Sequence, residues 1–387
     1  MMQSVEIFTG AGGLALGIAR AGFNHCLAVE CNFSACKTLF LNQDQIFTQN
    51  NLPYIFQAKV EEFDFSLIDK KVDLLAGGPP CQPFSHGGLH QGLLDKRDMF
   101  PQFVRAVREL KPKIFIVENV KGLLRKSFAK YFEYIILQLT YPEMVIKTGE
   151  TWIEHLSRLE QYNIKGMHKG LFYKVLFRLL NAADYGVPQR RERVFIVGIR
   201  SDINLQWSFP QPTHCQETLL WSQWVTGEYW EQYKIRKPEP PEKLVSKIKK
   251  LQSRLLTPEK QRWLTVRDAI HDLPDPTQIK TQNICNHWFV PGAKAYPGHT
   301  GSPVDEPAKT LKAGVHGVPG GENMIRFSNG TVRYFTIREA ARLQTFPDTY
   351  TFFGSWTEAM RQLGNAVPVT LSEKIACCLL NRLSKVS

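Results

Sequence analysis

The sequence predicts an α/β fold in which a doubly wound, Rossmann-like sheet is joined to a second, smaller and irregular domain. Two observations support this prediction. Short apolar runs of strand length alternate with helical patterns over the first 200 residues, which is typical of a parallel sheet covered by helices. A glycine-rich turn follows the first of these runs, at the place where such sheets bind their ligands.

The expected elements can be placed in order along the chain. Strands are expected at residues 4–8, 26–30, 72–76, 113–118 and 193–200, and helices at 13–22, 34–42 and 103–110. Residues 140–169 are expected to form a surface insertion with a short helix at 152–159. Thr336 with Glu339, and Ser355 with Glu358, fit the capping box, so a helix is expected to begin at each pair.

The composition of the chain changes after residue 200. Six of the eight tryptophans lie between Trp207 and Trp288, and residues 243–262 carry seven Lys or Arg against one acid. Residues 291–321 contain seven Gly and five Pro, so regular structure there should be sparse. We therefore predict a first domain at 1–200, a second at 201–330, and a C-terminal segment at 331–387 that completes the first.

Composition and charge narrow the class of protein. The 387 residues are 43% hydrophobic, too apolar for a disordered chain, and 48 Lys and Arg against 36 Asp and Glu give a net charge of +12. This excess favours a polyanionic partner, although a merely solvated basic surface stays open. The eight cysteines form no CxxC pair, so we expect reduced thiols and no metal site. We see no signal peptide or long apolar stretch, and expect a cytoplasmic protein with no membrane partner.

The glycine turn runs from Phe8 to Leu14 as FTGAGGL. Glycines let the backbone approach a ligand closely, and the helix that follows offers free amides. Glu30 ends the second strand, where a carboxylate can accept hydrogen bonds from ribose hydroxyls. Gly10-x-Gly12-x-x-Ala15 also fits the dinucleotide fingerprint, so a nicotinamide enzyme and a turn that binds nothing remain open at this point.

Three further motifs place reactive groups at strand ends. The run at 72–76 leads into GGPPCQPFS, which puts the Cys81 thiol at the carboxyl edge of the sheet, an unusual place for an inert buried cysteine. Glu118 ends another strand in ENV, where a carboxyl near apolar residues could have a raised pKa and donate a proton. The QRRER motif leads into a core strand, so at least one of its arginines is expected to enter the cleft.

Six blocks follow one another in a diagnostic order. They are FTGAGGL, GGPPCQPFS, ENV, QRRERVF, TIREAARLQTFPD from Thr336, and GNAVP from Gly364. In these blocks the chain resembles the cytosine-5 DNA methyltransferases of bacterial restriction–modification systems over nearly its whole length. The resemblance implies the S-adenosylmethionine-dependent methyltransferase form of the Rossmann-like sheet. The cysteine and arginine blocks have no role in a nicotinamide enzyme, so they disfavour that alternative.

The resemblance also implies a reaction. A sequence-specific enzyme would transfer a methyl group from S-adenosylmethionine to carbon 5 of a cytosine in double-stranded DNA. Cys81 would add to carbon 6 of a cytosine flipped out of the duplex, while Glu118 would contact ring nitrogen 3 and the exocyclic amine. Arg193 would bind the carbonyl oxygen at position 2, and Arg191 would support the site and a nearby phosphate.

Further site residues carry over from the same blocks. The residues expected around the cofactor are Phe8, Gly10, Gly12, Gly13, Leu14, Glu30, Pro80 and Asn365. The residues expected to contact DNA are Gln82, Ser85, Arg97, Arg191, Lys309, Lys312 and Arg326. Residues 201–330 would form the target-recognition domain.

The chain departs from the family at one point and leaves two alternatives. Where the family often has an acid at the adenine amine, this chain reads AKVE from Ala58 to Glu61, so either Glu61 takes that place through a shift in register or the adenine contact differs. A related transfer RNA methyltransferase is the second hypothesis, which the long recognition region disfavours. A catalytically inactive DNA-binding protein is the third, which the intact set of Cys81, Glu118 and Arg193 disfavours. We expect a monomer, with a partner endonuclease that it need not touch.

Overall fold

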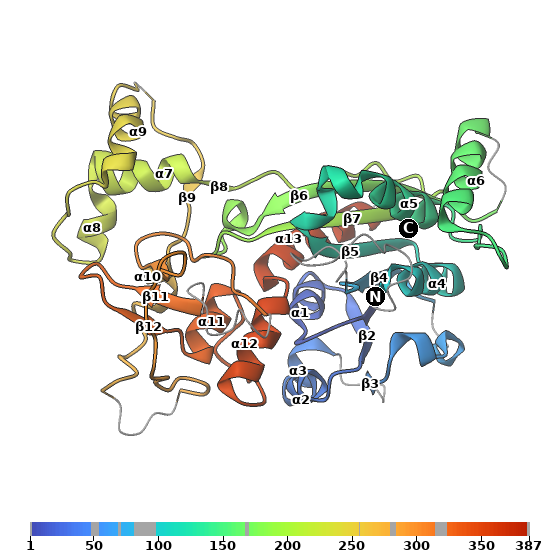
Figure 1. The fold of residues 1–387 in the computed structure, drawn as a ribbon, viewed down its shortest axis with the longest axis horizontal. Coiled ribbons are helices and arrows are strands. Elements are labelled where there is room, and N and C mark those ends of the chain that lie inside the picture. Colours follow the sequence, from blue (N-terminus) through green and yellow to red (C-terminus); the bar gives the residue numbers. More distant parts are fainter. Residues whose placement is uncertain are drawn as a thin grey trace.

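The structure is a computed structural model that describes residues 2–47, 54–68, 71–80, 98–166, 170–254, 256–278, 284–313 and 323–384. Four predicted site residues, Cys81, Gln82, Ser85 and Arg97, lie outside the described residues. The central feature of the fold is a seven-stranded sheet with helices on both faces (Figure 1). The α/β fold class predicted from the sequence is confirmed.

The sheet has the strand order β3-β2-β1-β4-β5-β7-β6. Its strands are β1 (Gln3–Ile7), β2 (Asn24–Glu30), β3 (Ile55–Gln57), β4 (Leu74–Gly77), β5 (Ile114–Val120), β6 (Tyr173–Asn181) and β7 (Glu192–Arg200). Strands β1 to β5 pair in parallel, but β7 runs antiparallel to both β5 and β6. The expectation of a wholly parallel sheet is therefore wrong at this edge. The link between β6 and β7 holds only the short helix η7 (Ala182–Tyr185) and a turn, too little for the crossover of a parallel pair.

Two pairs of helices cover the faces of the sheet. On one face α1 (Gly13–Arg20) and α13 (Val369–Leu383) pack side by side over the inner residues of β4 and β5. On the other face α4 (Phe100–Leu110) and α5 (Ala129–Thr140) bury their apolar sides against β1, β4 and β5. The remaining elements near the sheet are α2 (Phe33–Leu41), α3 (Gln43–Ile46), η1 (Val60–Glu62), η2 (Phe65–Leu67), η5 (Lys121–Leu124) and η6 (Lys126–Phe128).

Residues 140–169, the expected surface insertion, contain helix α6 (Trp152–Lys165), which is longer than expected and packs against the main core. It begins with a full capping box, in which Thr151 and Glu154 bind each other's backbone amides. It continues to Lys165, well past the expected end, because its amphipathic pattern does not stop at residue 159. Leu156 and Leu159 are buried in the same core as the sheet and α5. The segment is therefore part of the main fold.

The C-terminal helices begin close to the predicted positions. Helix α11 (Ile337–Leu343) has the predicted capping box between Thr336 and Glu339. Helix α12 (Trp356–Asn365) begins at Ser355, which accepts the backbone N–H of Glu358. The Glu358 carboxylate, however, binds Arg361 instead of the Ser355 amide, so only half of that box is present.

The region between β7 and α11 forms two packing units. Elements β8 (His214–Cys215), α7 (Gln216–Leu220), the π-helix η8 (Trp221–Thr226), α8 (Glu228–Gln232), α9 (Glu242–Gln252) and β9 (Gln261–Arg262) lie together at the upper left of Figure 1. A small core there includes Trp224, Trp230 and Leu251. Elements α10 (Val266–Ile270), β10 (Ser302–Pro303), β11 (Met324–Arg326) and β12 (Val332–Tyr334) share a core with α11 and α12 instead. The domain division at residue 330 stays a prediction.

One stretch of the described chain, 356–383, is long and apolar enough by composition to cross a membrane. It consists of α12 and α13, and 61% of its most apolar window is buried inside the protein. Core helices of this kind pass the same test, so the finding is weak evidence for a membrane span.

Candidate active site at the strand ends

The glycine turn after β1 is held in place by Glu30 at the end of β2. Gly10 and Gly12 have φ angles of +57° and +82°, in the left-handed region that favours glycine. The N–H of Gly10 donates to Glu30 Oε2 at 2.7 Å, and the N–H of Asn32 donates to Oε1 at 2.8 Å. A methyl group at Gly10 would meet no atom of the described residues within 4 Å, so that part of the chain leaves space beside the turn. Glu30 thus ties two strand ends together beside that space.

The block GNAVP lies directly against this turn. A methyl group at Gly13 would lie 2.2 Å from the Val367 carbonyl oxygen, so the two segments touch through their backbones. The Tyr350 hydroxyl also donates to the carbonyl of Ala11 at 2.6 Å. Asn365, the predicted cofactor residue of the block, is exposed. Two other predicted cofactor residues differ in burial: Leu14 is buried and Phe8 is half-buried.

Glu6 is a buried acid that the sequence reasoning missed. It lies on β1 beneath the turn with 1% of its surface exposed, and its Oε2 has no hydrogen-bond partner among the described residues. Burial, and then the negative charge of Glu30, raise the pKa of Glu6 well above its ordinary value. The only signal in the sequence is one acid within an apolar strand pattern.

We expect Glu6→Gln to stabilise the protein increasingly as the pH rises. Because the folded-state pKa of Glu6 is raised, Glu6 is protonated in both the folded and the unfolded protein at low pH. Its burial then makes no pH-dependent contribution to the free energy of unfolding. Above the unfolded pKa of about 4.3 the unfolded Glu6 ionises while the folded one stays neutral, so wild-type stability falls until the folded pKa is reached. Urea unfolding at pH 4 and pH 8 should show little difference between the proteins at pH 4 and a more stable variant at pH 8. An equal effect at both pH values would contradict the assignment.

Two hydrogen bonds fix the backbone that leads to Cys81. After β4 ends at Gly77, the carbonyl of Pro79 accepts from Asn119 Nδ2 at 3.0 Å, and that of Pro80 accepts from the N–H of Met99 at 3.4 Å. Asn119 belongs to the ENV block, so the strand that carries Glu118 also holds the proline pair. Cys81 is the next residue after Pro80 and lies outside the described residues.

Glu118 and Arg193 form a buried ion pair close to this backbone. Glu118 is 7% exposed, and its Oε1 lies 2.9 Å from Arg193 Nε. A methyl group at Gly78 would lie 3.4 Å from Glu118 Oε2, so the carboxyl adjoins the segment that leads to Cys81. Burial raises the pKa of Glu118 and outweighs the opposing effects of Arg193 and Arg191. The Glu118 carboxyl is therefore easier to protonate than an ordinary glutamate, although it lies beside the Arg193 guanidinium.

The other residues of QRRER have different partners. Arg190 is exposed, pairs with Glu306 at 2.8 Å and lies over the Trp263 ring. Glu192 pairs with Lys121 at 2.8 Å.

Arg191 lies in the interior of the protein. Its side chain is 0% exposed, and its Nη2 donates to the Gly364 carbonyl oxygen at 2.8 Å. The guanidinium binds backbone inside the protein, and the predicted phosphate contact stays a prediction. It joins the start of β7 to the GNAVP block, so its support of the site is indirect.

The predicted recognition residues lie on the segments around β10 and β11. Lys312 and Arg326 are exposed, and Lys309 is half-buried with its Nζ 3.2 Å from Thr300 Oγ1. Glu61, the candidate for the adenine contact, is exposed on η1. Among the described residues no group of three or more His, Cys, Asp or Glu side chains could hold a metal ion.

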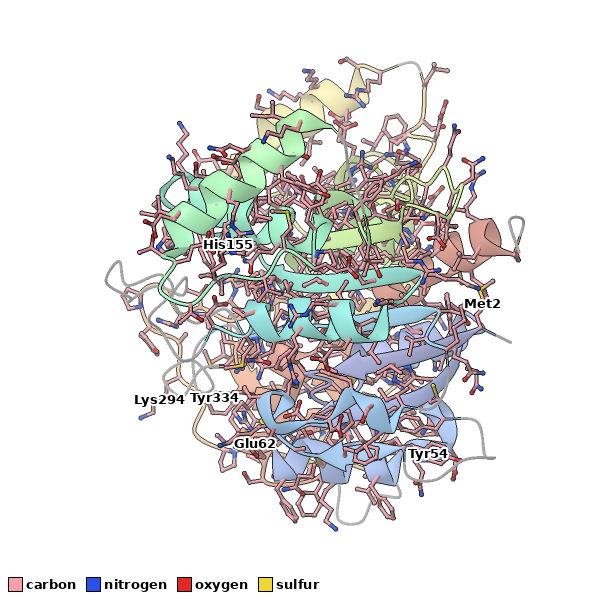
Figure 2. All side chains as sticks on the ribbon, turned by 90° about the vertical axis from the view of Figure 1, so that its right-hand side faces the viewer. Met2, Tyr54, Glu62, His155, Lys294 and Tyr334 are labelled. Carbon is pink, nitrogen blue, oxygen red and sulfur yellow. The ribbon has the colours of Figure 1, made fainter. Side chains whose placement is uncertain are left out.

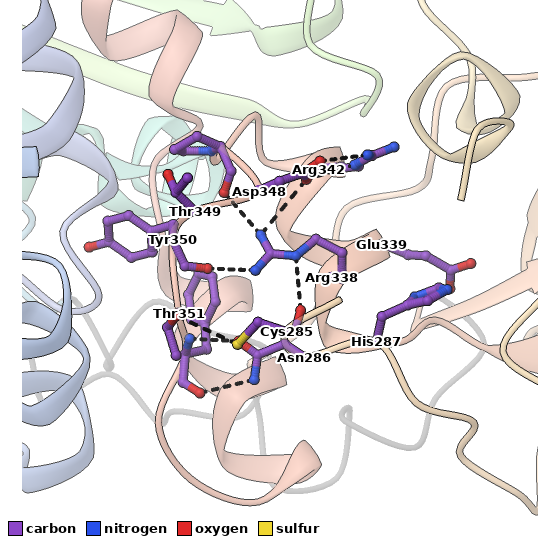
Figure 3. Close-up of polar contacts among 12 residues, drawn as sticks. Cys285, Asn286, His287, Arg338, Glu339, Arg342, Asp348, Thr349, Tyr350 and Thr351 are labelled. Atoms are coloured by element: carbon purple, nitrogen blue, oxygen red, sulfur yellow. Dashed lines mark hydrogen bonds and ion pairs between the residues drawn. The ribbon is translucent and has the colours of Figure 1, made fainter. Parts of the chain in front are cut away.

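The TIREAARLQ block has a structural position that sequence reasoning did not identify. Arg338 is 0% exposed, and its guanidinium donates to the carbonyls of Cys285, Pro347 and Tyr350 (Figure 3). Tyr350 in turn contacts the glycine turn through Ala11. This block therefore links the segment around residue 285 to the candidate cofactor site.

A pocket of about 500 Å³ lies beside Glu339 of the TIREAARLQ block. Its walls include Ile270, Phe289, Phe327 and Arg333, and it contains none of the predicted site residues.

Comparisons with known proteins identify the family of this chain. The family model described as C-5 cytosine-specific DNA methylase matches residues 2–142 and 147–381. The Type II methyltransferase M.PspPI of Psychrobacter sp. (strain TA137) is 32% identical over 381 residues, which cover 98% of this chain and 79% of the relative. The Type II methyltransferase M.Eco47II of Escherichia coli is 31% identical over 387 residues, covering 99% and 80%.

Solved structures share the fold at lower identity. A putative DNA modification methyltransferase encoded within an E. coli prophage superposes with a TM-score of 0.60 at 22% identity, covering 99% of this chain and 100% of the other. The S. pombe Dnmt2 methyltransferase gives a TM-score of 0.57 at 17% identity, with 99% of each chain covered. At these identities the likeness concerns the fold.

Proposed function

This chain belongs to the family of C-5 cytosine-specific DNA methylases and is a DNA (cytosine-5-)-methyltransferase, and from this premise we propose that it uses S-adenosylmethionine and a covalent Cys81 adduct to methylate cytosine in specific double-stranded sites. The observation that carries the proposal is the meeting of three strand ends. The backbone of Pro79 and Pro80, the buried Glu118 carboxyl and the Arg193 guanidinium adjoin one another.

The glycine turn supports the choice of cofactor. The space beside Gly10, two left-handed glycines and a strand-end carboxylate at Glu30 suit an adenosine and its ribose. Phe8, Leu14, Pro80 and Asn365 would complete the pocket. S-adenosylmethionine supplies an electrophilic methyl group when bound. The protein's residues hold and orient it, with both oxygens of Glu30 keeping lone pairs for ribose hydroxyls.

The chemistry of cytosine assigns the remaining roles. Carbon 5 is a poor nucleophile until a thiolate adds to carbon 6, so Cys81 forms a C–S bond there and carbon 5 gains enamine character. Glu118 in its acid form gives a proton to ring nitrogen 3, and Arg193 binds the carbonyl oxygen at position 2. The methyl group would leave the cofactor's sulfonium, whose sulfur keeps the bonding electrons as a neutral thioether. A base then removes the proton on carbon 5, the C–S bond breaks to release the Cys81 thiolate, and ring nitrogen 3 returns its proton to Glu118. A stacked base cannot reach these groups, so the cytosine is flipped out of the duplex.

The rest of the proposal concerns DNA recognition and biological setting. The net charge of +12 suits a phosphate backbone, and residues 201–330 would read the sequence, with Lys309, Lys312, Arg326, Gln82, Ser85 and Arg97 as contacts. Both relatives described above are Type II methyltransferases, which supports a role in a restriction–modification system. The enzyme would act in the cytoplasm as a monomer, without contact to a partner endonuclease.

Bisulfite sequencing tests activity, substrate and recognition sequence together. Plasmid DNA incubated with the protein and S-adenosylmethionine should contain protected cytosines within one short sequence, whereas DNA incubated without S-adenosylmethionine should contain none. Transfer RNA treated in parallel should stay unprotected. Protection of the transfer RNA alone would support the second hypothesis, and protection of neither substrate by a folded protein would contradict the proposal.

A further inference from the structure

We propose that Tyr131 and Trp152 are positioning residues for methyl transfer, which act on Pro80, the residue before Cys81, through Asp98 and Met99. This proposal rests on the proposed function, since it assigns a task to the α5–α6 unit in the placement of Cys81. The proposal rests on a buried hydrogen bond that the Tyr131 hydroxyl donates to Asp98 Oδ2. Asp98 is the first described residue after the 81–97 segment.

Asp98 is held from two sides. Its Oδ1 accepts the N–H of Phe100 at 3.2 Å, at the beginning of α4, while Oδ2 accepts from Tyr131 on α5. Asp98 is 8% exposed and Tyr131 is 6% exposed, so water competes little for either group. A buried carboxylate that loses a hydrogen-bond donor is destabilised, because no water replaces that donor. These hydrogen bonds therefore stabilise Asp98 at its present position.

The position of Asp98 bears on the residue before Cys81. Met99, which follows Asp98, donates its N–H to the carbonyl of Pro80. The residues on the two sides of the 81–97 segment are therefore joined directly, and Pro79 is joined to β5 through Asn119. A shift of Asp98 would pass through Met99 to Pro80, the neighbour of the nucleophile. Displacements of about 1 Å can slow an enzymatic reaction by about 100-fold.

Helix α6 supports Tyr131 from behind. The Trp152 ring packs edge-on to Tyr131, with centroids 6.1 Å apart, and also contacts Tyr134 at 5.7 Å. His155, labelled in Figure 2, forms a separate 2.8 Å hydrogen bond with the Tyr134 hydroxyl, and this bond involves neither Tyr131 nor Asp98. The ring contacts of Trp152 connect α6 through Tyr131 to Asp98. Helix α6 therefore helps to position the backbone before Cys81.

The test compares two hydroxyl deletions on the same helix. Tyr131→Phe removes the donor to Asp98, whereas the matched control Tyr134→Phe removes the bond to His155, which leads away from Cys81. Both tyrosines are buried on α5, so both variants should unfold a few degrees below wild type. Single-turnover formation of the covalent adduct with 5-fluorocytosine DNA is then measured for each protein. We expect about a tenfold slower adduct with Tyr131→Phe, an unchanged rate with Tyr134→Phe, and unchanged affinity for S-adenosylmethionine in both.

A double-mutant cycle separates positioning from general damage. If Tyr131 acts through Asp98, the Tyr131→Phe substitution should slow the adduct much less in an Asp98→Asn background, because that background already lacks the carboxylate to which the Tyr131 hydroxyl donates. Trp152→Phe should slow the adduct, whereas Ile153→Ala, at an exposed neighbour, should not. Equal rates for Tyr131→Phe and wild type, or equal slowing by Tyr131→Phe and Tyr134→Phe, would overturn the inference. Absence of an adduct with wild-type protein would instead overturn the proposed function.

Discussion

Replacement of Cys81 by alanine is expected to lower methyl transfer by at least about 10³-fold, because it removes the thiolate that we assign to the addition at carbon 6 of cytosine. Specific DNA binding should survive, since the thiol is small and the phosphate contacts come from other residues. Transfer is measured with labelled S-adenosylmethionine, and binding is measured by gel shift with the recognised duplex.

The covalent step gives this prediction a second measurement. With 5-fluorocytosine in the recognised site, fluorine replaces the carbon-5 proton and a base cannot remove it, so the C–S bond cannot break and the wild-type adduct should persist on a denaturing gel. Cys81→Ala should form no adduct. Cys378→Ala, at a half-buried cysteine whose thiol contacts Ser208, should form it at the wild-type rate. Methyl transfer or an adduct with Cys81→Ala would remove this residue as the nucleophile.

The parts of the site predicted from the sequence are those encoded locally. Glycines at positive φ, a proline pair before a cysteine, and an acid at a strand end each reveal their role within a few residues. Local patterns also indicate that strand ends meet at one edge of the sheet, and this is enough to predict that Glu118 lies near the proline pair. The short strand β3 escaped notice because three residues carry little pattern.

The parts not predicted depend on partners that are distant in sequence. Nothing within QRRER distinguishes Arg190, which pairs with Glu306, from Arg191, which binds Gly364. The direction of β7 depends on the short link from β6, and neither strand alone indicates it. The burial of Glu6 and the contact of Trp152 with Tyr131 likewise appear only when separate elements pack together.

Replacement of Glu118 by glutamine is expected to lower the rate of transfer by about 10²- to 10³-fold, because an amide can donate a hydrogen bond to ring nitrogen 3 but cannot give up a proton as a carboxylic acid does. The pH profile should also change. Burial raises the pKa of Glu118, so the wild-type acid form persists at pH values where an ordinary glutamate is ionised. The rate should fall as the pH rises through that folded-state pKa, while the Cys81 thiolate requirement makes the rate rise at lower pH.

The bell-shaped profile of the wild type should therefore become a single rising limb in Glu118→Gln, because only the thiol still titrates. The matched control is Glu192→Gln, at an exposed residue on the adjacent strand whose carboxylate pairs with Lys121, and it should keep the bell and nearly the full rate. Arg193 loses its ion-pair partner in Glu118→Gln, which could destabilise the fold. Thermal unfolding of the variant and the wild type shows whether a lower rate reflects unfolded protein. A falling limb that survives in Glu118→Gln would show that another group donates the proton, and Glu118 would then serve only to orient the cytosine.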